Sequence, residues 1–400
     1  MNLKSIFSGK LLHILQNYLT QVLNVAFILI LTAKVSPTEL GLYGVARSLF
    51  GLLEYSHLGS RFGLDVVVPK EEGVGGKVFS KVVIQTGLSV SVLAALIFSI
   101  VYQSVEVYYY LAGAVIYYFN NNVRLFYRAN GETANFVKKS LYQNVLTASF
   151  QLLGLLFFGF IGVFQGFLLA AVIMLIINRL SIVDIISSGK YQVSKFWTLQ
   201  KKGKALLVTS MLVLAVNVLD RLFIERYFGL EFAGFFTLVG LCVSSFAILP
   251  NSISELAISS IVKHSENLYQ SRKILKKIII QVFGGTLLLV LVSFFLIEPV
   301  VNLLFDQYSS IVTELKISLI SVLPLGATLI LQYYLVAQGK NAQVVMVNVL
   351  AFVTYYLGFI GIVNFVQEGI LMALVVNKII FAFLFFILIL VIAKKILIVR

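Results

Sequence analysis

Residues 380–392 read IFAFLFFILILVI, and no polar residue interrupts this run. A soluble amphipathic helix would carry a polar face, and a strand of a membrane barrel would alternate polar and apolar residues. A helix needs about 20 apolar residues to cross a hydrocarbon core of about 30 Å. The run therefore predicts a transmembrane helix, and similar runs recur along the whole chain.

The composition points the same way. The 400 residues are 60% hydrophobic and only 12% charged, whereas soluble domains carry about 25% charged residues. The formal net charge of +14 would suggest nucleic acid in a soluble protein. Here the basic residues lie in short loops between apolar runs, so we expect no nucleic-acid partner. One cysteine and three histidines predict neither a disulfide framework nor a metal site or cofactor.

The apolar runs predict an all-α integral membrane protein with about twelve transmembrane helices. The expected spans are 11–33, 41–60, 82–102, 107–127, 141–161, 163–186, 204–226, 233–262, 276–304, 315–338, 342–364 and 370–393. Lys and Arg mark the cytoplasmic side of a membrane protein. With the N-terminus inside, the outer loops hold only Lys34, Arg226 and Lys316 of the 31 basic residues. We expect both termini to be cytoplasmic, in a bacterial inner membrane.

An internal repeat divides the chain near residue 200. LTAKVSPTELGLYGVA at 31–46 aligns with IERYFGLEFAGFFTLV at 224–239, and Gly41 falls on Gly234. Each segment joins the first span of a half to its second. Six spans per half give both halves the same orientation, which is a known transporter design. We therefore expect an N-terminal six-helix lobe at 1–200 and a C-terminal six-helix lobe at 201–400, related by a parallel pseudo-repeat.

Several spans carry polar residues at membrane depth, where they are costly and usually face a cavity or another helix. Those that we take as candidates for binding substrate are Gln21, Asn24, Arg47, Asn121, Arg124, Arg221 and Lys378. The carboxylates that are candidates for ion coupling are Glu54, Asp220 and Glu225.

Structural alternatives stay open for most of these residues. Amide stripes often only join helices through hydrogen bonds, and Arg124 is near enough to a span end to reach lipid phosphates. Arg221 and Glu225 are four residues apart and suit an ion pair. Arg47 and Lys378 lie several residues inside their spans and fit these alternatives least well.

The candidate cations predict a positive cavity lined by amides and tyrosines. Such a cavity suits an anionic substrate rich in hydroxyl groups, because Arg binds anions through paired hydrogen bonds and amides serve sugar hydroxyls. Tyr117, Tyr118 and Tyr355 are among the rings suited to stack on sugar faces. The predicted cavity therefore indicates that the protein is a transporter.

Residues 17–59 and 219–236 resemble the first two spans and the start of the second half of bacterial polysaccharide exporters and O-antigen flippases (the Wzx type). The resemblance implies the fold of the multidrug/oligosaccharidyl-lipid/polysaccharide exporter superfamily. It also implies flipping of an undecaprenyl-pyrophosphate-linked oligosaccharide to the outer leaflet by alternating access. Arg47 and the Asp220–Arg221 pair are the positions that it carries over. Its partners would be the lipid-linked oligosaccharide, membrane lipid, and a polysaccharide polymerase with its chain-length machinery.

Three other functions are weighed against this one. A drug or cation antiporter of the same superfamily would prefer acidic residues deep in the first lobe, where Glu54 is the only good candidate. An enzyme of glycan assembly, such as a polymerase, would need a large outer loop, and none is expected here; we therefore expect no enzyme. A scaffold for glycan enzymes would not need charges inside the membrane.

Overall fold

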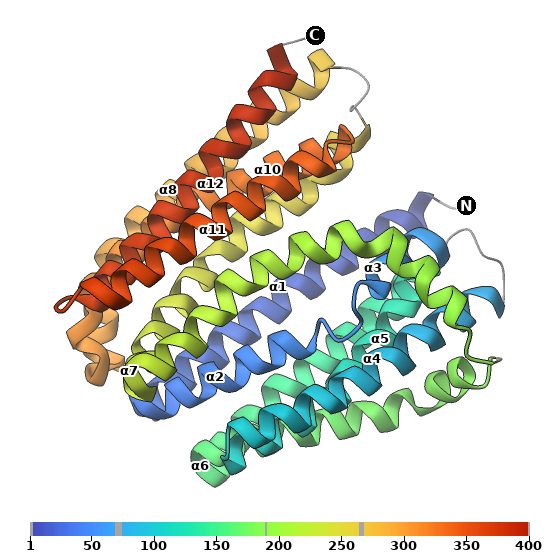
Figure 1. The fold of residues 1–400 in the computed structure, drawn as a ribbon, viewed down its shortest axis with the longest axis horizontal. Helices are drawn as coiled ribbons and strands as arrows, with labels where there is room; N and C mark the ends of the chain where they lie inside the picture. The colour runs from blue at the N-terminus through green and yellow to red at the C-terminus, as the bar shows by residue number, and fades with distance from the viewer. Residues whose placement is uncertain (1–2, 69–73, 189, 264–267, 399–400) are drawn as a thin grey trace. The chain divides into compact units, whose positions relative to one another are not determined.

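The computed structural model describes residues 3–68, 74–188, 190–263 and 268–398, and these contain helices and no strand (Figure 1). The chain divides into two compact units. Unit 1 comprises Met1–Val35 and Leu42–Leu214, and unit 2 comprises Ser36–Gly41 and Ala215–Arg400. The first turn of α2 therefore belongs to unit 2, and the first part of α7 belongs to unit 1.

Unit 1 contains α1 (Leu3–Lys34), most of α2 (Pro37–Leu53), α3 (Ser60–Val67), α4 (Val74–Val101), α5 (Val105–Ala129), α6 (Thr133–Ile186) and the beginning of α7 (Val193–Lys263). Unit 2 contains the rest of α7, then α8 (Leu268–Leu304), the short 3-10 helices η2 (Asp306–Ile311) and η3 (Leu319–Ser321), α9 (Val312–Ser318), α10 (Val322–Ala337), α11 (Asn341–Phe365) and α12 (Ile370–Ile398).

The helices are those of a multi-pass membrane protein. Within the described ranges, seven helices are long and apolar enough to cross a membrane. Large apolar side chains such as Phe157, Phe295 and Leu303 are 75%, 75% and 82% exposed, which is favourable against lipid and not against water. The expected all-helical membrane class is thus confirmed. Each expected span overlaps helical backbone, but 41–60 is helical only to Leu53. The count of twelve stays a prediction.

Two long helices are interrupted by glycine. The 54 residues of α6 would measure about 80 Å as one rod, far more than a bilayer core. Gly159 (φ 67°, ψ −152°) adopts a conformation open essentially to glycine alone, and the chain doubles back there (Figure 1). A Cβ on Gly154 would lie 1.9 Å from the Gly162 carbonyl oxygen, so the two arms pack backbone against backbone. Gly229 (φ 86°) interrupts α7 in the same way.

The start of α2 is fixed by a capping box. The Ser36 N–H donates to Glu39 Oε2 (2.8 Å), and the Glu39 N–H donates to Ser36 Oγ (3.3 Å). Pro37 follows at the first helical position, where its missing N–H costs nothing. This turn begins α2 three residues after α1 ends at Lys34.

The first turn of α2 then crosses α7 inside unit 2. A Cβ on Gly41 would lie 1.9 Å from the Leu230 carbonyl oxygen, and a Cβ on Gly234 would lie 1.8 Å from the Pro37 carbonyl oxygen. The contact is reciprocal about Gly41 and Gly234, the two glycines that the sequence comparison aligns. Only glycine at both positions allows backbones this close.

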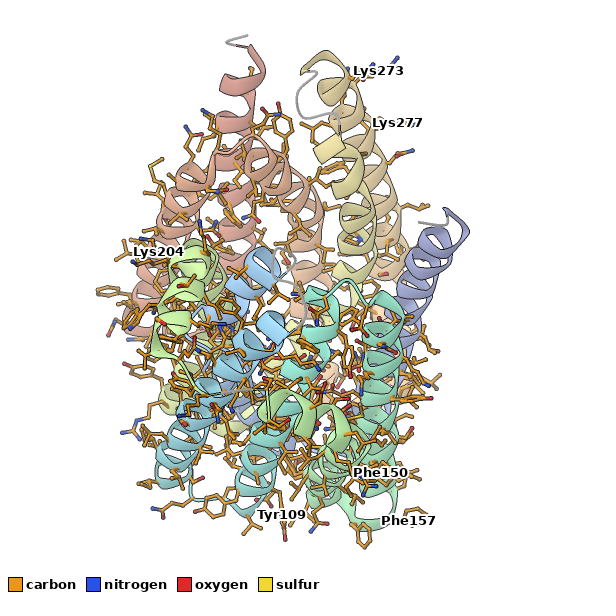
Figure 2. All side chains as sticks on the ribbon, turned by 90° about the vertical axis from the view of Figure 1, so that its right-hand side faces the viewer. Tyr109, Phe150, Phe157, Lys204, Lys273 and Lys277 are labelled. Atoms are coloured by element: carbon orange, nitrogen blue, oxygen red, sulfur yellow. The ribbon has the colours of Figure 1, made fainter. Side chains whose placement is uncertain are left out.

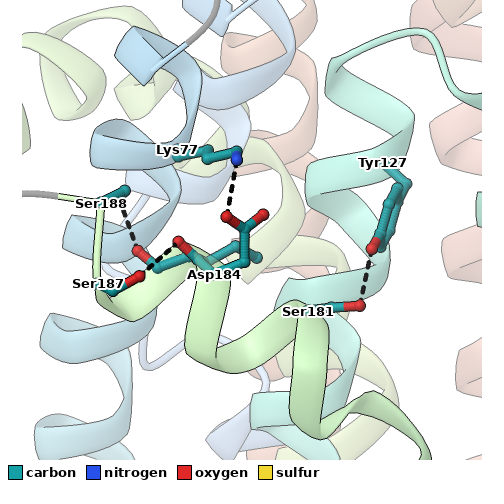
Figure 3. Close-up of polar contacts among 7 residues, drawn as sticks. Lys77, Tyr127, Ser181, Asp184, Ser187 and Ser188 are labelled. Carbon is teal, nitrogen blue, oxygen red and sulfur yellow. Dashed lines mark hydrogen bonds and ion pairs between the residues drawn. The ribbon is translucent and has the colours of Figure 1, made fainter.

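The ends of unit 1 differ in chemistry. Tyr109 of α5 and Phe157 of α6 lie at the same end (Figure 2), and aromatic rings are common at a membrane–water boundary. Where α4 begins and α6 ends, Lys77 Nζ pairs with Asp184 Oδ1 at 2.8 Å, and the Ser188 hydroxyl donates to the Ile185 carbonyl (Figure 3). Both charges are partly exposed, which suits a pair at the end of the helices.

Candidate functional site

A cavity of about 160 Å³ lies within unit 1, between α1, α2, α5 and α6. We call it the Arg47 cavity. It is lined by Asn24, Phe27, Ile28, Tyr43, Arg47, Phe50, Tyr110, Tyr117, Asn144, Thr147, Gln151 and Phe167. Among the described residues that line it, Arg47 is the one cation and none is a carboxylate.

Some polar groups of the Arg47 cavity are fixed by hydrogen bonds, and others make no hydrogen bond with the described residues. Asn144 Nδ2 donates to Thr20 Oγ1 (3.0 Å), which also accepts from Gln16 Nε2 (3.2 Å). This chain fixes the Asn144 amide. Arg47 is exposed and Gln151 is 5% exposed, and neither makes a hydrogen bond or ion pair with any residue that the structure describes. Gln151 lines the cavity, so its amide is available to a polar ligand or to water there.

Aromatic rings form the rest of the wall. Tyr110 and Phe167 stack with ring centroids 4.4 Å apart, and Tyr117 stacks on Phe167 at 5.8 Å. Phe50 meets Tyr117 edge-on at 5.2 Å. Such contacts fix ring orientation. The result is a rigid apolar surface beside the polar groups.

A second polar group lies at the end of α2. The helix stops at Leu53, and Gly59 (φ 90°) donates its N–H to His57 Nδ1 (2.9 Å) in the turn that follows. Asn121 Nδ2 donates to Glu54 Oε1 (3.4 Å), and Arg124 donates to Asn121 Oδ1. The Asn121 amide thus connects Glu54 to the Arg124 guanidinium, whose positive charge balances the charge of the Glu54 carboxylate.

In unit 2, four residues form what we call the ion-pair cluster: Asp220, Phe236, Tyr355 and Lys378. The Asp220 side chain is fully buried, and Lys378 Nζ lies 2.7 Å from its Oδ2. The Tyr355 hydroxyl donates to the same oxygen (3.1 Å), while the Arg221 N–H donates to Oδ1 (2.7 Å). The Lys378 ammonium also lies 4.3 Å from the centre of the Phe236 ring. A buried carboxylate requires this degree of pairing.

The residues singled out by sequence thus fall into separate places. Arg47 and Asn24 line the Arg47 cavity, whereas Glu54, Asn121 and Arg124 share one hydrogen-bonded chain. Arg221 and Glu225 are half-buried in α7, and each interacts with other groups of the protein. The Gln21 side chain lies outside the described residues. Among the described residues, no group of three His, Cys, Asp or Glu could hold a metal ion.

Two tyrosines have roles other than the expected sugar stacking. Tyr118 is 1% exposed and packs against Gly87, and Tyr355 binds Asp220. Tyr117 does line the cavity. The residues singled out from the sequence do not include Asn144, Thr147 and Gln151, although their spacing of three and four residues places them on one face of a helix. That periodicity is the signal that would have found them.

No protein-family model matches the chain, and no curated protein matches it. Solved structures do match, and they define a transporter fold. An inward-facing multidrug resistance MATE family transporter of the MOP superfamily matches with a TM-score of 0.72 and 15% identity, over 94% of this chain and 95% of that chain. The outward-facing form matches with a TM-score of 0.63 and 14% identity, over 96% and 95%.

The chain is also similar to a lipid flippase. The lipid II flippase MurJ, in an inward closed conformation, matches with a TM-score of 0.75 and 16% identity, over 96% of this chain and 87% of that chain. At these identities the similarity establishes the fold of the chain, and the fold is that of multidrug exporters and a lipid flippase.

Proposed function

We propose that this protein is a flippase that moves an undecaprenyl-pyrophosphate-linked oligosaccharide, such as an O-antigen or capsule repeat unit, from the cytoplasmic to the outer leaflet. The fold shared with a lipid II flippase supports this proposal, as does the sequence resemblance to polysaccharide exporters. The proposal includes twelve spans, two six-helix lobes, cytoplasmic termini and a bacterial inner membrane. It assigns no enzymatic activity.

The distribution of charge is the observation that carries the proposal. Arg47 lines a cavity that has no carboxylate among its described lining residues. Glu54 of the same unit is bonded to Asn121, and Asp220 of unit 2 is paired with Lys378. An unpaired cation inside a membrane is costly unless an anion joins it. Arg47 therefore supports an anionic substrate.

A flippase role follows from the physics of such a substrate. A pyrophosphate and its sugars cannot cross hydrocarbon unaided, because each unpaired polar group costs several kcal/mol. Alternating access in a polar, cationic cavity would remove most of that cost while the lipid tail stays in the bilayer. A polysaccharide polymerase and chain-length machinery would then act on the exposed product. Glu54, Asp220 and Glu225 remain the candidates for ion coupling.

A drug or cation antiporter is the second candidate, and the match to MATE transporters favours it. It would need an available carboxylate facing its cationic substrate. Glu54 is the acid of unit 1 that the sequence singles out for this role. Its hydrogen bond to Asn121 and the surrounding Arg47, Arg61 and Arg124 oppose a second cation. We therefore favour the flippase over the antiporter.

The test is the fate of lipid-linked glycan in cells that lack the protein. We expect the linked oligosaccharide to accumulate in the cytoplasmic leaflet while surface polymer is lost, and the wild-type gene to reverse both changes. Unpolymerised repeat units already exposed on the outer leaflet would contradict flipping and favour a polymerase or scaffold. Unchanged glycan with increased drug sensitivity would favour the antiporter.

A further inference from the structure

We propose that the Arg47 cavity binds a single acidic sugar of the transported glycan, with the sugar carboxylate on Arg47 and the ring inside the aromatic wall. This inference rests on the proposed function, because it assigns one part of the transported molecule to one site. It names a class of substrate, glycans that contain a uronic acid, and it separates the sugar site from any site for the pyrophosphate.

The size of the cavity limits the ligand to about one ring. Pockets that enclose a drug-sized ligand measure roughly 300–1,000 Å³, and this one measures about 160 Å³. Arg47 and Asn24 are exposed, whereas Gln151 and Tyr110 are 5% and 4% exposed. The first two therefore lie toward the opening and the last two line the interior. A single sugar ring fits inside, with its charged substituent at the opening.

The charge of the cavity selects the kind of anion. The described residues of its lining include one cation and no carboxylate. A sugar carboxylate brings one negative charge and two oxygens, which a guanidinium binds through two parallel hydrogen bonds. A pyrophosphate brings at least two charges, and a second cation would be needed to balance it. A uronic acid therefore matches Arg47 better than the linking phosphates do.

The remaining polar groups match sugar hydroxyls. The Gln151 amide, the Asn144 carbonyl oxygen and the Tyr110 hydroxyl make no hydrogen bond with the described residues. Amides offer both donors and acceptors, and a sugar hydroxyl needs both. The stacked rings of Tyr117 and Phe167 supply a flat surface for the C–H face of the sugar. The cavity thus has an apolar and a polar surface side by side, and a sugar ring has the same two surfaces.

The experiment measures binding of free glucuronate, glucose and inorganic pyrophosphate to the purified full chain in lipid nanodiscs, by saturation-transfer NMR. We expect glucuronate to bind at least about 10-fold more tightly than glucose, since a hydrogen bond to a charged group is worth about that much. Arg47→Gln should remove this preference. Arg226→Gln, which removes an exposed guanidinium of α7 in unit 2, is the matched control and should keep it.

A second variant separates binding from folding. Gln151→Leu should weaken glucuronate binding roughly 10-fold, the worth of a hydrogen bond to the ligand. It should leave the thermal midpoint of unfolding nearly unchanged, because Gln151 makes no hydrogen bond with the described residues. A lower midpoint with unchanged binding would make Gln151 a packing residue and overturn its role in the site.

Other outcomes overturn the inference in distinguishable ways. Pyrophosphate binding that depends on Arg47, without glucuronate binding, would assign the cavity to the linking phosphates. Flipping of lipid-linked glycan without any glucuronate binding would remove the acidic-sugar site and leave the proposed function intact. Absence of flipping for every lipid-linked glycan would instead remove the proposed function.

Discussion

Asp220 is a single residue that connects three helices. The carboxylate comes from α7, the ammonium from α12 and the Tyr355 hydroxyl from α11. In a low-dielectric interior such a pair adds little net stability compared with apolar residues of equal volume, but each charge alone is very costly. The ion-pair cluster is therefore sensitive to the loss of either partner.

Removing one charge of the pair should be worse than removing both. We expect Lys378→Met to lower the free energy of unfolding by about 3–5 kcal/mol, because it leaves a buried carboxylate unpaired. The double variant Asp220→Asn with Lys378→Met should recover most of that loss. Denaturant or thermal unfolding in detergent measures both.

The same variants test whether Lys378 also binds substrate. If the double variant is stable and still flips glycan, Lys378 has a structural role alone. If it is stable and inactive, Lys378 or Asp220 contributes to transport. A single Lys378→Met variant as stable as the wild type would contradict the account of the pair.

At the scale of helices, the crossing of α2 and α7 depends on two glycines. Gly41→Ala and Gly234→Ala would each place a Cβ within 2 Å of a backbone oxygen, which no rotamer change relieves. We expect each to lower stability by about 1–3 kcal/mol or more, as for overpacking generally. Thermal unfolding of the purified variants measures the loss.

Gly361→Ala is the matched control for these two variants. It lies in α11, and a Cβ there meets no atom within 4 Å. Alanine favours a helix over glycine by about 1 kcal/mol, so this variant should be as stable as the wild type or more so. Equal behaviour of all three variants would mean that the crossing does not constrain the fold.

The helices were predictable because membrane crossing imposes a long apolar run on the sequence. The breaks at Gly159 and Gly229 also follow from length, since neither α6 nor α7 could be one straight span. The early end of α2 at Leu53 was not predicted, because the turn depends on a local hydrogen bond from Gly59 to His57 rather than on hydropathy.

The site was predictable only in part. Arg47 stood out by charge and depth, and Asn24 by its helical stripe. The pairing of Lys378 with Asp220 was not predicted, because it depends on how α7, α11 and α12 pack, and no local pattern encodes this. Gln151 was missed because one amide in an apolar run carries little signal by itself, and its signal lies in its spacing from Asn144 and Thr147 on one helical face.

At the scale of the whole molecule, the fold and the charges support one account. The fold is shared with multidrug exporters and a lipid II flippase over nearly the full length of the chain. Its net charge is +14, yet Asp220 is paired with Lys378 and Glu54 is tied to Asn121. Arg47 makes no ion pair with the described residues and is therefore available to bind an anion. This distribution supports the proposal of an anionic substrate.

The measurement that tests this account most directly is flipping of a lipid-linked, uronate-containing oligosaccharide in liposomes that contain only the purified protein. A glycan-modifying enzyme that cannot cross the membrane reports the fraction in the outer leaflet. We expect the wild type and Arg226→Gln to move the oligosaccharide from the inner to the outer leaflet. Arg47→Gln should do so roughly 10-fold more slowly, because the loss of one hydrogen bond to a charged group costs about that much. Equal rates for Arg47→Gln and the wild type, or no flipping by the wild type, would contradict it.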